Sequence, residues 1–204
     1  MQCIVLNLSK KEVCGMKANL QKRNIAVFCG SDMGKKTAFC EAAEELGKWI
    51  GKNKDVLIYG GGDAGLMGVV SKNAYQAGSK VIGVVPKNVD FMKKRSQEYV
   101  TTLIETSDMS ERKQKMMDIA DVFIALPGGI GTLDEMSEAI TMTKIGAFHK
   151  PCIFFNKDDY YAPLKRMFDE MEQAGFWWKD SRKHVLFSEN FEEIERFITT
   201  EDRK

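Results

Sequence analysis

The sequence predicts an α/β fold, a doubly wound parallel sheet with helices on both faces. Short apolar runs alternate along the chain with segments whose apolar residues recur at helical spacing. Strands of a parallel sheet are buried on both faces, so they are apolar throughout rather than at every second position. Three of these runs end in a glycine-rich turn, after Phe28, Tyr59 and Leu126. Ligands bind such sheets at the carboxyl ends of the strands, so the three turns can converge on one crevice.

Length and composition indicate one globular domain with a sizeable core. The chain has 204 residues, of which 44% are hydrophobic and 29% charged. There are 30 basic and 29 acidic residues, so the charge gives no reason to expect nucleic acid or a membrane surface as partner. No apolar run is long enough to span a bilayer, and residues 1–10 lack the pattern of a secretory signal. We therefore predict a cytoplasmic protein.

Cysteine and histidine give no sign of a metal site. The five cysteines are scattered and form no Cys-x-x-Cys pair, which favours reduced, buried thiols. His149 and His184 are the only histidines, and no cluster has metal-ligand spacing. We predict that the protein holds no metal ion.

The expected elements follow from periodicity and from the residues that interrupt it. Residues 1–23 lack clear periodicity and are predicted to form an N-terminal extension, which leaves a single domain at 24–204. Strands are expected at 25–28, 56–59, 81–85, 100–104, 122–126, 152–155 and 185–187. Helices are expected at 39–50, 66–77, 108–119, 132–145, 162–174 and 188–199. Gly51, Gly78 and Gly146 supply helix stop signals, and Asp108 with Glu111 has the spacing of a capping box.

The most informative stretch is Phe123-Ile-Ala-Leu-Pro-Gly-Gly-Ile-Gly-Thr-Leu-Asp-Glu135, which has the pattern of strand, glycine turn and helix start. Such a turn points backbone N–H groups and the positive end of the helix dipole at an anion, most often a phosphate. The Gly-Lys-Ser/Thr ending of a Walker loop is missing, so a single phosphate fits better than a triphosphate with magnesium. The candidate phosphate ligands are Gly128, Gly129, Gly131 and Thr132.

Two charged residues near this stretch have open interpretations. Thr132 and Glu135 have capping-box spacing, in which the glutamate accepts a hydrogen bond from the cap N–H. Alternatively, Glu135 stands beside a bound sugar phosphate, where it could activate water, hold the sugar hydroxyls or stabilise an oxocarbenium-like centre. Arg112 is either a surface residue near a helix start or a side chain that faces the same crevice.

The second glycine turn, Gly60 to Gly65, matches the G-x-G-x-x-G pattern of dinucleotide-binding sites. It follows the second strand rather than the first, and no acidic residue ends the third strand, so a nicotinamide or flavin cofactor is not expected. The glycines instead let the backbone approach a mononucleotide or sugar phosphate, or pack a tight turn. The candidate substrate-binding residues in the first two turns are Gly30, Ser31, Gly61 and Gly62.

The stretch Pro127 to Glu135 resembles the PGGxGTxxE signature of the Lonely Guy family. Further matches occur in the same order over roughly residues 24–178: Cys29-Gly-Ser31, Tyr59-Gly-Gly-Gly62, Gly65-Leu-Met-Gly68, Arg112-Lys113 and His149-Lys-Pro151. The resemblance implies a Rossmann-like fold, a homodimer and a phosphoribohydrolase that needs no cofactor. Such an enzyme cleaves the N-glycosidic bond of a nucleoside 5′-monophosphate, a cytokinin riboside monophosphate or AMP, to free base and ribose 5-phosphate.

The resemblance also implies roles for particular residues. Arg112 and Glu135 match the family's catalytic pair, and Lys113 is expected to bind substrate. Three residues depart from the common family pattern: Ser110, Met142 and Lys144. These departures affect the expectation about which substrate is bound more than the expectation about which reaction is catalysed. Related sequences are often labelled lysine decarboxylases, but nothing in this sequence suggests a pyridoxal phosphate site. The alternative to an enzyme is a protein of the same fold that carries a nucleotide or phosphorylated cofactor without turning it over.

Overall fold

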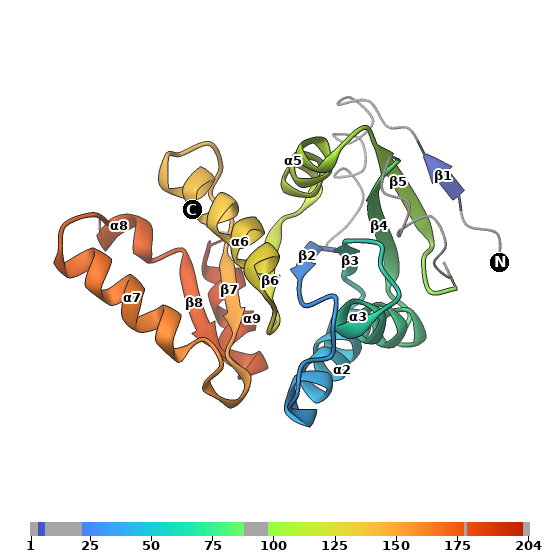
Figure 1. Cartoon of the computed structure of the whole chain (residues 1–204), viewed down its shortest axis with the longest axis horizontal. Helices are drawn as coiled ribbons and strands as arrows, with labels where there is room; N and C mark the ends of the chain where they lie inside the picture. The colour runs from blue at the N-terminus through green and yellow to red at the C-terminus, as the bar shows by residue number, and fades with distance from the viewer. Residues whose placement is uncertain (1–3, 7–21, 88–97, 178, 202–204) are drawn as a thin grey trace.

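The computed structural model describes residues 4–6, 22–87, 98–177 and 179–201, which form one eight-stranded parallel sheet flanked by helices (Figure 1). The strands are β1 Ile4–Leu6, β2 Asn24–Phe28, β3 Val56–Tyr59, β4 Lys80–Pro86, β5 Thr102–Thr106, β6 Val122–Ala125, β7 Cys152–Phe155 and β8 Val185–Ser188. The helices are α2 Thr37–Lys52, α3 Gly65–Gln76, α5 Met109–Ile119, α6 Ile130–Lys144, α7 Ala162–Gln173, α8 Lys179–Arg182 and α9 Phe191–Glu201, with a short 3-10 turn η1 at Lys157–Asp159.

The strand order reverses in the middle of the sheet. The order is β1-β5-β4-β3-β2-β6-β7-β8, and the neighbouring strands are parallel. From β2 the chain builds outward through β3 and β4 to β5, then returns to place β6 on the other side of β2. Phe28 of β2 is in register with Ala125 of β6. The carboxyl ends of these two strands therefore flank the switch point at which doubly wound sheets bind ligands.

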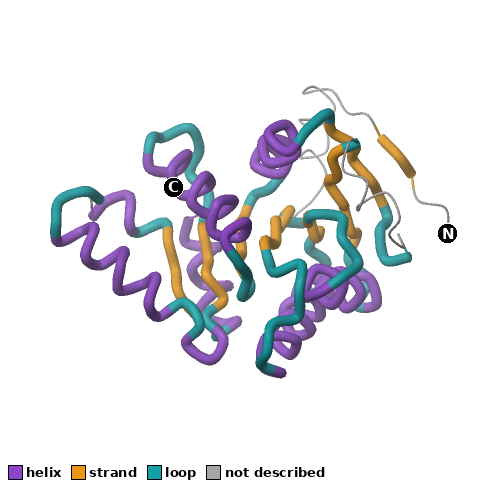
Figure 2. Tube along the Cα trace, in the orientation of Figure 1, coloured by secondary structure: helices purple, strands orange, loops and turns teal. Residues whose placement is uncertain are grey.

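Helices cover both faces of the sheet, which confirms the predicted fold class (Figure 2). On one face, α2, α3 and α9 pack through Phe39, Leu46, Ile50, Leu66, Val70, Ile194 and Ile198. On the other face, α5, α6 and α7 pack through Met116, Met117, Ile119, Met136, Ala139 and Phe168. The strands between these layers are buried on both sides, which explains their uninterrupted apolar runs.

The predicted strands and helices are all present, with small shifts at their ends. Three short elements were not predicted: β1, η1 and α8. Ile4–Leu6 lies within the predicted extension yet pairs with β5 at the edge of the sheet, so this part of the prediction needs correction. A three-residue edge strand has too little periodicity to be recognised from sequence. The division at residue 24 stays a prediction, because residues 1–3 and 7–21 lie outside the described ranges.

The capping box at the start of α5 is confirmed with one change. The Asp108 carboxylate accepts a hydrogen bond from the Glu111 N–H at 2.8 Å. Glu111 reaches back to the N–H of Ser107 at 2.6 Å instead of to that of Asp108. Hydrogen bonds from Ser107 lower the pKa of Glu111. The cap fixes the direction in which α5 leaves β5, and so the position of Arg112 one turn later.

Arg23, at the predicted domain boundary, is part of the core structure. Its guanidinium donates to both carboxylate oxygens of Asp55, at 3.2 and 2.7 Å, and to those of Glu195, at 2.8 and 3.0 Å. The Asp55 side chain is only 1% exposed and also accepts from the Arg23 backbone N–H at 3.0 Å. The network joins the start of β2 to the α2–β3 turn and to α9.

We expect Asp55→Ala to lower the free energy of unfolding by about 3 kcal/mol, because it leaves a largely buried guanidinium whose remaining carboxylate partner, Glu195, is partly exposed. Urea unfolding measures the loss. Lys48→Ala is the matched control, because it breaks an exposed pair with Glu44 on one helix, worth roughly 0.5 kcal/mol or less. Equal losses in the two variants would contradict a structural role for the Arg23 network.

Two further observations concern composition. Cys29, Cys40 and Cys152 are free thiols, as expected, whereas Cys3 and Cys14 lie outside the described residues. Across the ranges that the structure covers, no helix is both long enough and apolar enough to cross a membrane.

Candidate active site

A cavity of about 730 Å³ lies at the carboxyl ends of β2, β3 and β6, beside the switch point of the sheet. Its walls come from the turns after these three strands, from the first turns of α3 and α5 and from the first half of α6. The residues that line it are Cys29, Gly30, Ser31, Gly60, Met67, Met109, Ser110, Arg112, Lys113, Gly129, Ile130, Gly131, Thr132, Asp134 and Glu135. Three segments far apart in the sequence thus meet in one site, as the sequence analysis predicted.

The glycine loop, residues 126–132, forms the end of this cavity that is suited to an anion. Helix α6 begins at Ile130 with Gly129 as its N-cap, and no side chain in the described residues caps it. The first N–H groups of a helix have no intrahelical partner, so they can bind a ligand, and the helix dipole favours a negative charge there. Thr132 is 3% exposed and lines the same cavity.

The glycines of this loop are required for different reasons. A Cβ at Gly128 would clash with the Thr132 hydroxyl, so folding itself requires glycine at this position. At Gly129 and Gly131 an added Cβ would have no described heavy atom within 4 Å, and neither residue has a positive φ. Glycine within a helix costs about 1 kcal/mol relative to alanine. Since packing does not require Gly131, we infer that it keeps space for a ligand close to the backbone.

Arg112 and Glu135 form a buried ion pair in the wall of the cavity. The distance from Arg112 Nη1 to Glu135 Oε1 is 2.9 Å, and the two side chains are 7% and 14% exposed. Arg112 Nε also donates to the carbonyl of Val84 at 3.0 Å, which fixes the guanidinium against β4. The interpretation of Arg112 as a surface residue is therefore wrong, and the alternative that it faces the crevice is confirmed.

The capping-box interpretation of Glu135 is also wrong. The N-cap of α6 is Gly129, so Thr132 lies inside the first turn and Glu135 beyond the position from which it could reach the cap N–H. Its carboxylate accepts from Arg112 instead. Burial raises the pKa of Glu135 above its ordinary value, although the nearby Arg112 opposes this shift. A raised carboxyl pKa is typical of groups that exchange protons during catalysis.

Lys113 pairs with the second carboxylate beside the candidate anion site, that of Asp134. Its ammonium lies 3.0 Å from the Asp134 carboxylate and 2.8 Å from that of Glu138, both on α6. Asp134 is thereby paired, so its charge opposes a bound anion less. These partners raise the pKa of Lys113. Lys113 therefore lines the cavity, but its ammonium group is paired with the carboxylates of Asp134 and Glu138.

Two predicted binding residues lie behind the cavity wall. Gly61 and Gly62 are buried and do not line the cavity, whereas Gly60 does. Gly61 has φ +73° and a Cβ there would clash with Val85, so it serves the turn. A Cβ at Gly60 would clash with Arg112 Nη2. The sequence identified the glycine turn that borders the cavity. Only the packing against Arg112 shows that Gly60 is the glycine of this turn that lines it.

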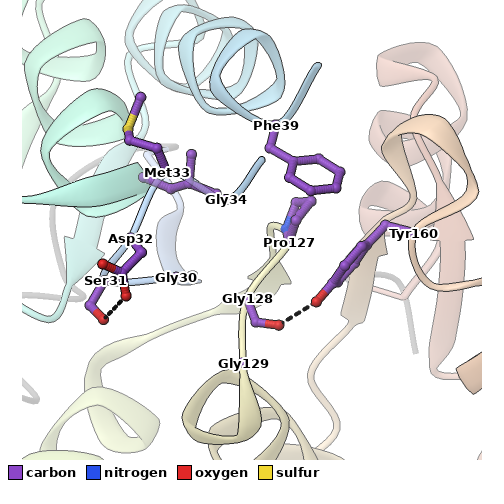
Figure 3. A pocket seen from close by; sticks show the side chains of 11 residues that line it. Gly30, Ser31, Asp32, Met33, Gly34, Phe39, Pro127, Gly128, Gly129 and Tyr160 are labelled. Carbon is purple, nitrogen blue, oxygen red and sulfur yellow. Dashed lines mark hydrogen bonds between the residues drawn. The ribbon is translucent and has the colours of Figure 1, made fainter. Parts of the chain in front are cut away.

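A smaller cavity of about 290 Å³ adjoins the glycine loop and shares Gly30, Ser31 and Gly129 with the larger one (Figure 3). Phe39 and Tyr160 form part of its wall, and the Tyr160 hydroxyl donates to the carbonyl of Gly128 at 2.6 Å. No local pattern in the sequence marks Tyr160, because it lies on the turn before α7, far from the glycine loop along the chain.

The three departures from the family pattern have different positions. Ser110 lines the larger cavity, so it is placed to affect ligand choice. Met142 lines neither of these cavities, and Lys144 donates to the carbonyl of Phe176 at 2.9 Å, away from Glu135. Within the described residues, no group of three His, Cys, Asp or Glu side chains is arranged to hold a metal ion.

Comparison with known proteins gives consistent matches. A protein-family model described as "Possible lysine decarboxylase" matches residues 67–198. The cytokinin riboside 5′-monophosphate phosphoribohydrolase of Rhodococcoides fascians is 35% identical over 170 residues, 83% of this chain and 86% of that protein. The enzyme of that name LOG7 from Arabidopsis thaliana is 39% identical, over 85% of this chain and 80% of its own. For the probable enzyme LOGL2 of Oryza sativa subsp. japonica, identity is 43%, over 80% of this chain and 66% of the relative.

Solved structures show the same fold. The molybdenum cofactor binding protein from the phototrophic bacterium Rippkaea orientalis aligns with a TM-score of 0.69 at 24% identity, over 89% of this chain and 98% of its own. The Moco carrier protein from Chlamydomonas reinhardtii aligns with a TM-score of 0.66 at 21% identity, over 88% and 99%. Identities this low establish the likeness of fold alone.

Proposed function

Because the chain belongs to the Lonely Guy family of cytokinin riboside 5′-monophosphate phosphoribohydrolases, we propose that it hydrolyses the N-glycosidic bond of a nucleoside 5′-monophosphate. The products are free base and ribose 5-phosphate, and the candidate substrates are cytokinin riboside monophosphates and AMP. The observation that carries this proposal is the buried Arg112–Glu135 pair, which shares one cavity with the uncapped amino end of α6.

The amino end of α6 binds the 5′-phosphate in this proposal. Gly129 and Gly131 leave the backbone accessible, and Thr132 supplies a hydroxyl beside the N–H groups. Gly30 and Ser31 lie on the neighbouring turn and complete this end of the cavity. Once the phosphate is bound here, the ribose extends along the wall that contains Glu135.

Glu135 acts on the anomeric carbon. Breaking a glycosidic bond builds positive charge at this carbon, and a nearby carboxylate stabilises that charge and accepts a proton from the attacking water. The water oxygen bonds to the anomeric carbon, and the base leaves with the electron pair of the carbon–nitrogen bond and takes up a proton. Arg112 holds the carboxylate in place and keeps it ionised, and it also orients the nucleotide.

We further propose that the enzyme is a cytoplasmic homodimer, as the family resemblance implies. Large apolar side chains are exposed at both ends of α6 and beside it: Ile130 is 83% exposed, Ile145 68% and Phe176 77%. A second copy of the chain covering such residues would remove them from water. Light scattering during size-exclusion chromatography measures the mass, and a monomer at micromolar concentration would contradict the homodimer.

An activity assay tests the proposed function. Purified protein is incubated with AMP, isopentenyladenosine monophosphate and a panel of other nucleoside monophosphates, and chromatography detects free base and ribose 5-phosphate. We expect release of both products in equal amounts. Binding of nucleotide without turnover of any panel member would overturn the proposal and support a carrier instead.

Gly131→Ala separates stability from ligand binding in the glycine loop. We expect its free energy of unfolding to rise by up to about 1 kcal/mol, because alanine is the better helix former and the space is open. We expect the KM for AMP to rise, because the added methyl group occupies the space kept for the phosphate. Urea unfolding and steady-state kinetics measure the two effects. A variant that is more stable and has an unchanged KM would contradict the placement of the phosphate.

A further inference from the structure

We infer that Tyr160 and Tyr161 are positioning residues that hold the carbonyl groups of the glycine loop away from the bound phosphate. The inference rests on the proposed function only in taking the glycine loop as the phosphate site. Neither tyrosine belongs to the signature that carries the family resemblance, and both come from the turn between β7 and α7.

The two hydroxyls bind alternate carbonyls of the loop. Tyr161 donates to the carbonyl of Leu126 at 2.7 Å. Tyr160 donates to that of Gly128 at 2.6 Å, a hydrogen bond drawn in Figure 3. The carbonyls between and after them are also occupied: Pro127 accepts from the Gly30 N–H at 3.1 Å, and Gly129 from the Leu133 N–H at 3.2 Å. Four consecutive carbonyls, Leu126 to Gly129, therefore each have a donor.

The direction of each carbonyl matters because a peptide group carries its C=O and its N–H on opposite sides. If the Gly128 carbonyl rotated toward the cavity, it would repel a phosphate, and the N–H of the next residue would rotate away from it. A glycine-rich loop has little steric resistance to such a rotation. The Tyr160 hydroxyl, which holds the Gly128 carbonyl on the far side, therefore keeps the Gly129 N–H directed at the anion before it binds. The residue after Leu126 is Pro127, which has no N–H, so Tyr161 only keeps the Leu126 carbonyl turned away from the anion.

The surroundings of both tyrosines keep the hydroxyls in place. Tyr161 is 3% exposed and packs edge-on against Phe154, with ring centroids 4.9 Å apart. Its backbone N–H donates to the side chain of Asn156 at 2.7 Å, which anchors the turn to the end of β7. Tyr160 packs edge-on against Phe39 of α2, with centroids 5.1 Å apart. Burial also raises the pKa of Tyr161, so its hydroxyl stays a donor at neutral pH.

The test compares a ligand that carries the phosphate with one that lacks it. Tyr160→Phe, Tyr161→Phe and the double variant are made in a Glu135→Gln background, which prevents turnover, and calorimetry measures the Kd for AMP and for adenosine. Tyr75→Phe is the matched control, since it removes a tyrosine hydroxyl on α3 outside both cavities. We expect each single site variant to weaken AMP binding about fivefold, the value of one net hydrogen bond, and the double variant to weaken it by roughly the product of the two losses. The Kd for adenosine should stay unchanged in all three.

Two results would overturn the inference. One is a Kd for AMP that changes no more in Tyr160→Phe and Tyr161→Phe than in Tyr75→Phe. The other is an equal loss for AMP and adenosine, because general loosening of the site would weaken both ligands. The proposed function fails separately: if the unmodified protein hydrolyses no nucleotide but the selective loss of AMP binding is found, the positioning role stands without the reaction.

Discussion

Replacing Glu135 by glutamine is expected to lower kcat for AMP hydrolysis by about 10³-fold, while AMP still binds. Glutamine keeps the size of the side chain and a carbonyl oxygen that can accept from Arg112. It cannot accept a proton from water, and it carries no charge to stabilise an oxocarbenium-like centre. A positioned general base contributes about 10²- to 10⁴-fold, and the expected loss lies in the middle of this range. Steady-state kinetics measures kcat, and calorimetry measures the Kd for AMP.

The matched control is Glu138→Gln, which neutralises a carboxylate on the same helix one turn later. Glu138 is paired with Lys113 and does not line the cavity. We expect its kcat to stay within about threefold of the unmodified protein, as for a surface ion pair of small energy. Equal losses in both variants would mean that the total charge of α6 matters, and not the position of Glu135.

Replacing Arg112 by methionine is the second change with a large expected effect. We expect kcat/KM to fall by about 10²-fold at neutral pH, because the carboxylate loses its ion pair and its orientation. The pH dependence gives a sharper test. Burial holds the pKa of Glu135 above its ordinary value, and Arg112 opposes that shift. Without Arg112 the pKa rises further, so the carboxylate becomes protonated at a higher pH.

The acid limb of the kcat/KM profile should therefore move to higher pH by roughly one unit or more in Arg112→Met, the usual effect of one nearby opposite charge. Arg112→Lys is the control. It keeps the charge but cannot bond both Val84 and Glu135 through a planar fork, so its acid limb should move less although its activity also falls. An acid limb at the same pH in all three proteins would show that Glu135 is not the group that limits activity at low pH.

Most of the fold could be predicted from local sequence patterns. The apolar runs, the glycine stops and the capping box of Asp108 each depend on residues a few positions apart, and the structure contains each of them. Two short pieces, β1 and α8, have too few residues to produce a pattern. The loop after Leu126 was likewise predicted as an anion site from its glycines alone, and its helix begins with no side-chain cap.

The same local patterns left the interpretation of Glu135 and Arg112 open. Thr132 and Glu135 have the spacing of a capping box, and Arg112 follows an exposed cap, so each residue alone has an ordinary structural explanation. Their pairing depends on the start of α5 meeting the first half of α6 beside the switch point, and the two residues are 23 positions apart. No local spacing encodes that contact.

The sequence by itself therefore determined seven of the eight described strands, the position of the candidate anion site and the chemical types of the catalytic candidates. Only the tertiary structure decided which of these residues meet. It paired Arg112 with Glu135, selected Gly60 over Gly61 and Gly62, and brought Tyr160 and Tyr161 to the glycine loop from beyond β7. The physical reason is that elements arise from interactions within a few residues, whereas a site in a doubly wound sheet forms where strands distant in the chain become neighbours.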